Sequence, residues 1–172
     1  MVYNCRICEK GTVMLAFVSA FKSAVIGTID ADGFPFSSYA PFVYDEHRYY
    51  VFISDIAAHS GNLRREKKAS LFFIEDESSA ANLFARKRVS LQCETDIVPR
   101  NGVRFDIIMD AFGRRFDPEF IAMLRQMQDF NLHEFRPVAG EATFGFGEAY
   151  TLGGEHMETL IPRRGGGHQK AK

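Results

Sequence analysis

The chain has 172 residues, of which 46% are hydrophobic and 25% charged, and its formal net charge is −1. This length allows one domain with a sizeable apolar core, and the composition is that of a globular protein rather than a disordered or fibrous one. The near-neutral charge argues against nucleic acid or anionic membranes as partners, since both require a surplus of cations.

The first 22 residues are expected to form an extension that contains one helix. Within it, Thr12–Phe21 is an apolar run too short to span a bilayer, so no membrane insertion is predicted. This run could instead be the apolar part of an export signal, but its flank is hardly basic, and we prefer a helix packed on a sheet edge.

The cysteines indicate a reducing location. Their number, three, is odd, which argues against a disulfide framework and favours the cytoplasm. Cys5 and Cys8 form a single CxxC pair. A structural zinc site needs four ligands and a redox CxxC follows a strand, so we interpret this pair as incidental.

Period-two patterns predict five strands in the first half of the chain. The first two are joined at Asp30–Gly33, where glycine can supply a positive φ. A short helix is predicted between the third and fourth strands, and a turn or helix before the fifth. The predicted strands are Ser23–Ile29, Phe34–Val43, Tyr49–Ser54, Ser70–Glu77 and Arg88–Val98.

The second half of the chain changes period. Apolar residues recur at helical spacing from Pro99 to about Phe130, with Asp117 as a helix cap and Pro118 at the first helical position. Two last strands, 130–137 and 141–150, are predicted on either side of a turn at 138–140. The pattern indicates a mainly β (α+β) fold, an antiparallel barrel of about six strands with flanking helices, over residues 23–160.

Polar residues follow the third predicted strand. His59, Ser60 and Asn62 lie at the start of the short helix, where free backbone N–H groups attract phosphate or carboxylate. The alternative is plain capping by Asp55 or Ser60.

Two further candidate sites contain charged residues. Arg86 and Arg88 alternate onto one face of the fifth strand, where they could clamp an anion or merely protect a sheet edge. Asp129 lies between the last helix and a strand, as a turn residue or as a partner that orients a histidine. No Ser/His/Asp order, P-loop or dinucleotide glycine motif supports a hydrolase or a nucleotide motor.

Residues 161–172 are predicted to form a flexible tail. Its last ten residues, "RRGGGHQKAK", contain three glycines and several cations, typical of a solvated linker. One histidine, His168, follows the glycines.

Several stretches taken in order resemble the haem-utilisation branch of the pyridoxamine-phosphate-oxidase-like, FMN-binding split barrels, whose members include bacterial haem-degrading proteins. The resemblance covers residues 23–150, with the tail histidine beyond it. The motifs are "SYAPFV", "YYVFIS" followed by "IAAHSGNL", "SLFFIEDE", "NLFARKR", "MQDFNL" and "GFGEAY".

The resemblance implies a homodimer of split barrels with haem bound at the subunit interface. It implies that His168 holds the haem iron and that Asp129 of the other subunit accepts a hydrogen bond from this imidazole. Such a carboxylate fixes the tautomer and raises the basicity of the ligand. It further implies that His59, Asn62 and Arg88 lie near the cofactor or its propionates.

The resemblance leaves three functions open. One is oxidative haem degradation with an external electron donor, and another is haem carriage without turnover. A third is an FMN-dependent oxidoreductase, although the segments that match the flavin phosphate site, "SYAPFV" and "HSGNL", hold no cation. This tail is also more basic than the family's usual ending.

Overall fold

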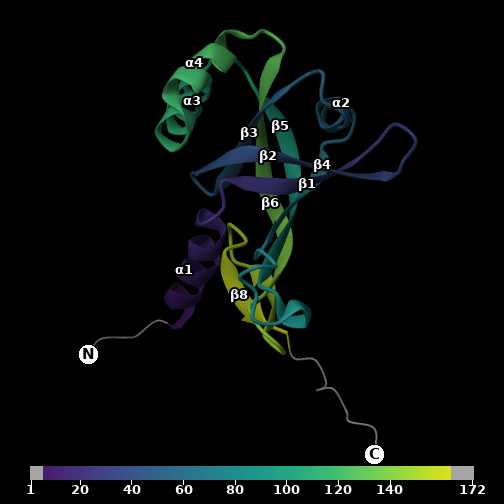
Figure 1. Ribbon diagram of the computed structural model, residues 1–172, viewed down its shortest axis with the longest axis vertical. Helices are drawn as coiled ribbons and strands as arrows, with labels where there is room; N and C mark the ends of the chain where they lie inside the picture. The colour runs from purple at the N-terminus through teal and green to yellow at the C-terminus, as the bar shows by residue number, and fades with distance from the viewer. Residues whose placement is uncertain (1–5, 164–172) are drawn as a thin grey trace, which may run out of the picture.

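The computed structural model describes residues 6–163, with side chains from Val13 onward. Figure 1 shows the arrangement of its helices and strands. The elements are α1 (Arg6–Ser19), β1 (Ser23–Ile29), β2 (Pro35–Asp45), β3 (Arg48–Ser54), α2 (Ala58–Arg65), β4 (Lys68–Ile74), the 3₁₀ turn η1 (Leu83–Ala85), β5 (Arg88–Val98), α3 (Val103–Arg115), α4 (Pro118–Gln126), β6 (Phe130–Thr143), β7 (Ala149–Gly153) and β8 (Thr159–Pro162).

Six antiparallel strands close into a barrel, as the sequence predicted. The order is β3-β2-β1-β4-β5-β6, and β3 also pairs with β6, which joins the two edges. The predicted turn after β1 is present. Gly33 has a φ of +85°, and the Asp30 carboxylate accepts hydrogen bonds from two backbone N–H groups of the turn.

The last strands differ from the prediction. The sequence indicated a turn at 138–140, but β6 runs through this segment as one strand of 14 residues. The pairing with β5 shifts here, because Gln92 lies opposite Ala139 and Cys93 opposite Pro137. Val138 is therefore the extra residue of a β-bulge. A bulge accommodates Pro137 and Gly140, which in the sequence are typical of a turn.

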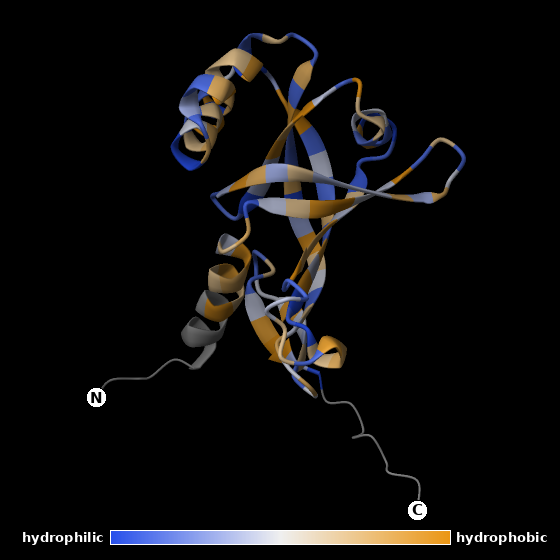
Figure 2. Cartoon of the chain, in the orientation of Figure 1, coloured by the Kyte–Doolittle hydropathy of each residue, from blue (hydrophilic) through white to orange (hydrophobic). Residues whose placement is uncertain are grey.

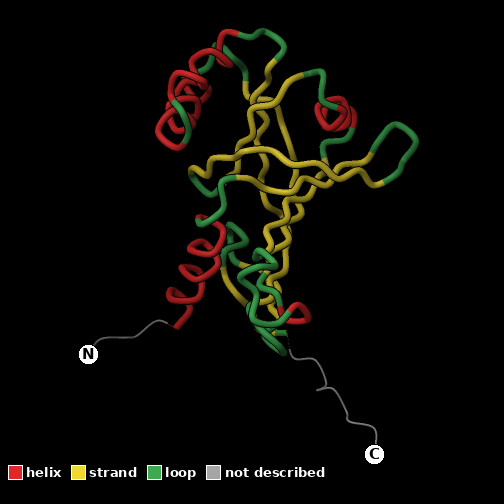
Figure 3. Tube along the Cα trace, viewed as in Figure 1, coloured by secondary structure: helices red, strands yellow, loops and turns green. Residues whose placement is uncertain are grey.

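Beyond the barrel, β6 continues into a hairpin of β7 and β8, against which α1 packs (Figures 1 and 3). The predicted helix in the apolar N-terminal run is thus present, and it buries Met14 and Val18 in the same core as the barrel. None of the helices in residues 6–163 has the length and apolar character needed to cross a membrane.

A second apolar core lies outside the barrel, where α3 and α4 cover β3 and the start of β6. Its members include Tyr50, Phe52, Phe105, Ile108 and Leu132. The predicted boundary between the two helices is confirmed, because the Asp117 carboxylate caps α4 by accepting a hydrogen bond from Phe120 N at 2.8 Å.

The barrel interior is apolar over most of its length and polar at one end. Apolar and polar residues alternate along its strands (Figure 2), and Phe42, Tyr49 and Phe73 fill the interior. At the end near α2, the inward positions are polar instead, and His133 on β6 is 1% exposed. No hydrogen bond within the described residues reaches its Nε2.

Burial at this end makes the fold sensitive to acid. Desolvation, with smaller contributions from Arg64 and His59, lowers the pKa of His133 from 6.5 to about 4. As the pH falls from 6.5 towards 4, His133 binds a proton in the unfolded chain but not in the folded chain. We therefore expect His133 to lower the free energy of unfolding by roughly 3 kcal/mol between pH 6.5 and pH 4.

Urea denaturation at several pH values measures this loss. His133→Leu should remove about that much of the acid dependence, while the carboxylates contribute equally to both proteins. His156→Leu, at a half-exposed histidine, is the control and should keep the wild-type slope. Parallel curves for wild type and His133→Leu would contradict the assignment.

Candidate functional site

Helix α2 closes the polar end of the barrel with the residues that the sequence proposed as an anion site. His59 is 8% exposed, and its Nδ1 lies 2.8 Å from Ser38 Oγ. Asn62 Nδ2 donates to Thr28 Oγ1 at 2.9 Å. Burial lowers the pKa of His59 from its usual value, which favours the neutral form of the ring. These two side chains thus pack into the barrel end, rather than face solvent at a free helix start.

The capping alternative is wrong for this helix. Its N-cap is Ala57, and no side chain caps it. Ser60 Oγ instead donates to Asp55 Oδ1 at 3.1 Å, and Asp55 also pairs with Arg64 on the last turn of α2. Although burial opposes it, hydrogen bonds to these partners hold the pKa of Asp55 below its usual value.

Asp129 lies beside this end of the barrel, in the turn between α4 and β6. Its Oδ2 accepts a hydrogen bond from Ser54 Oγ at 2.7 Å. Its backbone carbonyl accepts one from Asp55 N at 2.7 Å. The side chain is only partly buried. Ser54 was not predicted from the sequence, because its only signal was its place as the last residue of an apolar strand.

Arg88 lies far from Asp129 within the subunit. It begins β5 opposite Thr143, the last residue of β6, whereas Asp129 precedes the first residue of β6. Its Nη1 donates to the Arg86 carbonyl at 3.0 Å. Arg86 itself is bound to the Glu75 carbonyl and to Glu77, so the two arginines do not form a free anion clamp.

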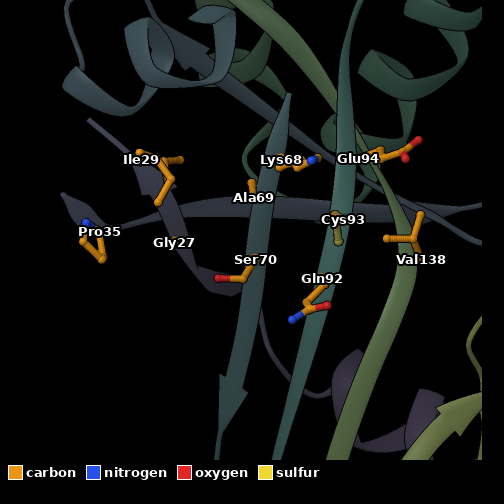
Figure 4. A pocket seen from close by; sticks show the side chains of 11 residues that line it. Gly27, Ile29, Pro35, Lys68, Ala69, Ser70, Gln92, Cys93, Glu94 and Val138 are labelled. Atoms are coloured by element: carbon orange, nitrogen blue, oxygen red, sulfur yellow. The ribbon is translucent and has the colours of Figure 1, made fainter. Parts of the chain in front are cut away.

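An open cleft of about 520 Å³ lies on the outer face of the sheet (Figure 4). Its floor is the row Gly27–Ser70–Gln92 across β1, β4 and β5. A Cβ on Gly27 would collide with Ser70 Oγ, so a larger residue here would require the Ser70 side chain to move. The lining residues are Gly27, Thr28, Ile29, Pro35, Lys68, Ala69, Ser70, Gln92, Cys93, Glu94 and Val138.

The cleft is mostly apolar and offers no reactive group. Ile29 and Val138 are exposed apolar side chains in its wall, and Lys68 is a cation at its edge. Cys93 belongs to the barrel core, and burial raises the pKa of its thiol to about 12. A thiol of this kind is not a nucleophile at neutral pH. The arrangement suits a flat apolar ligand rather than covalent chemistry.

The histidines of the described chain are all engaged or buried. His47 and His156 stack on each other with ring centroids 3.7 Å apart, and His47 Nδ1 lies 2.8 Å from Glu158 Oε1. His59 and His133 are buried at the barrel end. Residues 6–163 contain no cluster of three or more His, Cys, Asp or Glu that could hold a metal ion. The predicted ligand His168, and Cys5, lie outside the described residues.

The chain is similar to proteins of a known family. The sequence profile of the pyridoxamine 5'-phosphate oxidase family matches residues 12–144. A haem oxygenase, HutZ of Vibrio cholerae serotype O1, is 39% identical over 140 residues, which is 81% of this chain and 79% of that protein.

Solved structures agree with this match. The crystal structure of V. cholerae HutZ, described as a haem storage protein, has a TM-score of 0.64 and 36% identity over 80% of this chain and 91% of that one. Campylobacter jejuni ChuZ has a TM-score of 0.80 and 31% identity over 93% of this chain and 65% of that one. The chain therefore belongs to the pyridoxamine 5'-phosphate oxidase family of split barrels, in its haem-utilisation branch.

Proposed function

We propose that this protein is a homodimeric haem-binding protein of iron acquisition that degrades haem oxidatively. The observation that carries the proposal is the 39% identity to a haem oxygenase over most of both chains. The crystal structure of the same V. cholerae protein is described as that of a haem storage protein. Haem carriage without turnover is therefore the alternative within the same binding function.

The outer cleft supports a flat, apolar ligand at a subunit interface. Haem is a large apolar disc with two carboxylates, and a site for it needs apolar walls with cations at the rim. Ile29 and Val138 provide such walls, and Lys68 lies at the rim, opposite Glu94 on β5. Further exposed apolar residues, Val25 and Tyr39, continue this face on neighbouring strands. We propose that a second subunit covers this face and completes the site.

The four described histidines leave His168 as the proposed axial ligand. Two of them pair with each other, and the other two are buried at the barrel end. None of the four lines the cleft. The resemblance to the family implied that the tail histidine holds the iron. The positions of the four described histidines, away from the cleft, support that assignment. Imidazole is the usual proximal ligand of haem iron.

Chain length limits which carboxylate His168 could contact. The described chain ends at Arg163, which pairs with Glu141 at 2.9 Å near the far end of β6. Five residues extend at most about 17 Å, which is the upper limit on how far the Cα of His168 can lie from Arg163. Asp129 precedes the opposite end of β6, and the 12 steps from Glu141 along an extended strand span roughly 40 Å.

A pair between His168 and Asp129 would therefore join two subunits. The reach of the tail, even with both side chains added, is shorter than the length of β6 that separates these residues in one subunit. Symmetry would then give two equal sites in each dimer. In each, the carboxylate of one subunit would hold the imidazole of the other in the tautomer that binds iron.

The flavin alternative has less support from the described residues. A flavin phosphate needs cations, and the candidates on α2 are already committed. Arg64 pairs with Asp55, and Arg65 donates to Asn62 Oδ1 and to the Ile29 carbonyl. FMN therefore serves as the competing outcome in the binding test.

Bound haem would supply both the iron that activates oxygen and the macrocycle that is cut. The residues of this chain would bind the disc, hold the imidazole and limit solvent access at the interface. Electrons would come from an external donor, because oxidative cleavage of the macrocycle consumes electrons in every turnover and the protein's own side chains cannot supply them repeatedly. Transfer of electrons to a site at a subunit rim needs no path through the barrel.

Haemin titration of the apoprotein tests the binding function. We expect a Soret band with the position of histidine-ligated haem, and its loss or a clear shift in His168→Ala. His156→Ala, which removes a half-exposed histidine paired elsewhere, should behave as wild type. Ascorbate and oxygen should then bleach the Soret band, whereas a stable band would favour carriage. Purified protein that is yellow with FMN and ignores haemin would overturn the proposal.

Mixed dimers test the proposed contact between subunits. His168→Ala and Asp129→Asn are each expected to have two defective sites per homodimer. In a mixed dimer both substitutions fall in one site and the other site is wild type, so about a quarter of all sites should recover after equal mixing. The measurement is the haem spectrum after co-refolding, with the separately refolded proteins as control. No recovery would show that the two residues do not act across an interface.

A further inference from the structure

The turn that carries Asp129 is held from two sides. On one side, Asp55, the residue that follows β3, donates its N–H to the Asp129 carbonyl, and the Ser54 hydroxyl donates to the carboxylate. On the other, the guanidinium of Arg100 donates to backbone carbonyls around the turn. These are Arg125 at 2.7 Å, Phe130 at 2.8 Å and Met127.

Arg100 belongs to the turn before α3, so it joins that segment to the end of α4. Its guanidinium also lies over the rings of Phe52 and Phe105, at 5.8 and 5.3 Å from their centroids. A planar fork that donates to three carbonyls and packs between two aromatic rings fixes a backbone more firmly than one hydrogen bond would. Hydrogen bonds from both sides therefore hold the backbone of the turn around Asp129.

One oxygen of the Asp129 carboxylate accepts a hydrogen bond from the described chain, and the other does not. Oδ2 accepts from Ser54 Oγ at 2.7 Å, while no hydrogen bond from residues 6–163 reaches Oδ1. A free aspartate side chain would rotate about two bonds and lose that freedom on binding a partner. With Oδ2 fixed, the direction of Oδ1 is set before any partner arrives.

We propose that Ser54 is a positioning residue for Asp129, and that Arg100 supports it by holding the turn. Ser54 orients the carboxylate so that Oδ1 accepts the N–H of an incoming imidazole. This inference rests on the proposed function, in which that imidazole is the haem ligand. The inference goes beyond the proposed function by naming the residues that orient the Asp129 carboxylate in the free protein.

Ser54→Ala in the full-length protein tests the proposal. Loss of a partner behind a metal-bound histidine typically lowers affinity by about 10-fold or more, so we expect this for Asp129→Asn. Ser54→Ala should lower haemin affinity by several-fold, less than Asp129→Asn. It should also lower the frequency of the iron–imidazole stretching band, because a misaligned carboxylate polarises the ligand less. Ser54→Thr keeps the hydroxyl and should restore both values.

Ser79→Ala is the matched control, since it also removes a serine hydroxyl hydrogen bond, to the Asp76 carbonyl at 3.0 Å in the β4–β5 loop. A purely structural effect would lower the unfolding midpoint in Ser54→Ala without moving the stretching band. An unchanged band and affinity in Ser54→Ala, beside a clear defect in Asp129→Asn, would overturn the positioning role.

A readout without haem separates this inference from the proposed function. In the apoprotein, the ¹³C chemical shift of the Asp129 carboxyl carbon should change in Ser54→Ala and remain as in wild type in Ser79→Ala. If wild type fails to bind haemin, the proposed function is wrong, and this shift still decides whether Ser54 orients the carboxylate. An identical shift in wild type and Ser54→Ala would refute the orientation.

Discussion

The continuity of β6 is the constraint on which the rest of the structure depends. Its first half closes the barrel against β3, and its second half carries the β7–β8 hairpin. One strand therefore begins next to Asp129 and ends next to the place where the tail departs. Two groups at opposite ends of a rigid strand cannot meet within a subunit. The proposed pair of Asp129 with the tail histidine would therefore need two copies of the chain.

The packing of the barrel interior also favours a ligand site on the outside of the barrel. Aromatic residues fill it along most of its length, and α2 closes the remaining end with His59 and Asn62. A close-packed interior has no room for a macrocycle. A ligand of that size can bind only at an outer surface, where one subunit supplies an open, partly apolar face. Burial of such a ligand then requires a second surface.

Local signals in the sequence predicted much of the fold. The turn at Asp30–Gly33 and the start of α4 at Asp117 were predictable because each depends on neighbours within four residues. The course of β6 was not. Pro137 and Gly140 favour a turn locally, and only the pairing with β5, which the sequence does not reveal, converts that segment into a bulged strand. Long-range pairing overrode a local preference.

Some residues of the candidate site could likewise be predicted from the sequence, and others could not. The sequence identified His59, Asn62 and Asp129 as residues of possible function, but the first two are buried in the barrel end by contacts with β1 and β2. Ser54 and Arg100 were not predicted, since their partners lie 75 or about 30 residues away in the chain. Groups that touch a ligand can be suggested by type and spacing. Groups that orient them depend on which distant segments the fold brings together.

A ligand proposed on a terminal tail has an energetic consequence. The two apolar cores of the described chain are built from side chains between Met14 and Leu160, whereas the proposed iron ligand lies in the sequence beyond residue 163. Ordering a glycine-rich segment costs more conformational entropy than fixing a helical one. The axial bond would therefore be weaker than one from a rigid element, and any group that orients its partner in advance offsets part of that cost. A preorganised carboxylate on the partner subunit would offset part of this entropy cost without any change in the tail itself.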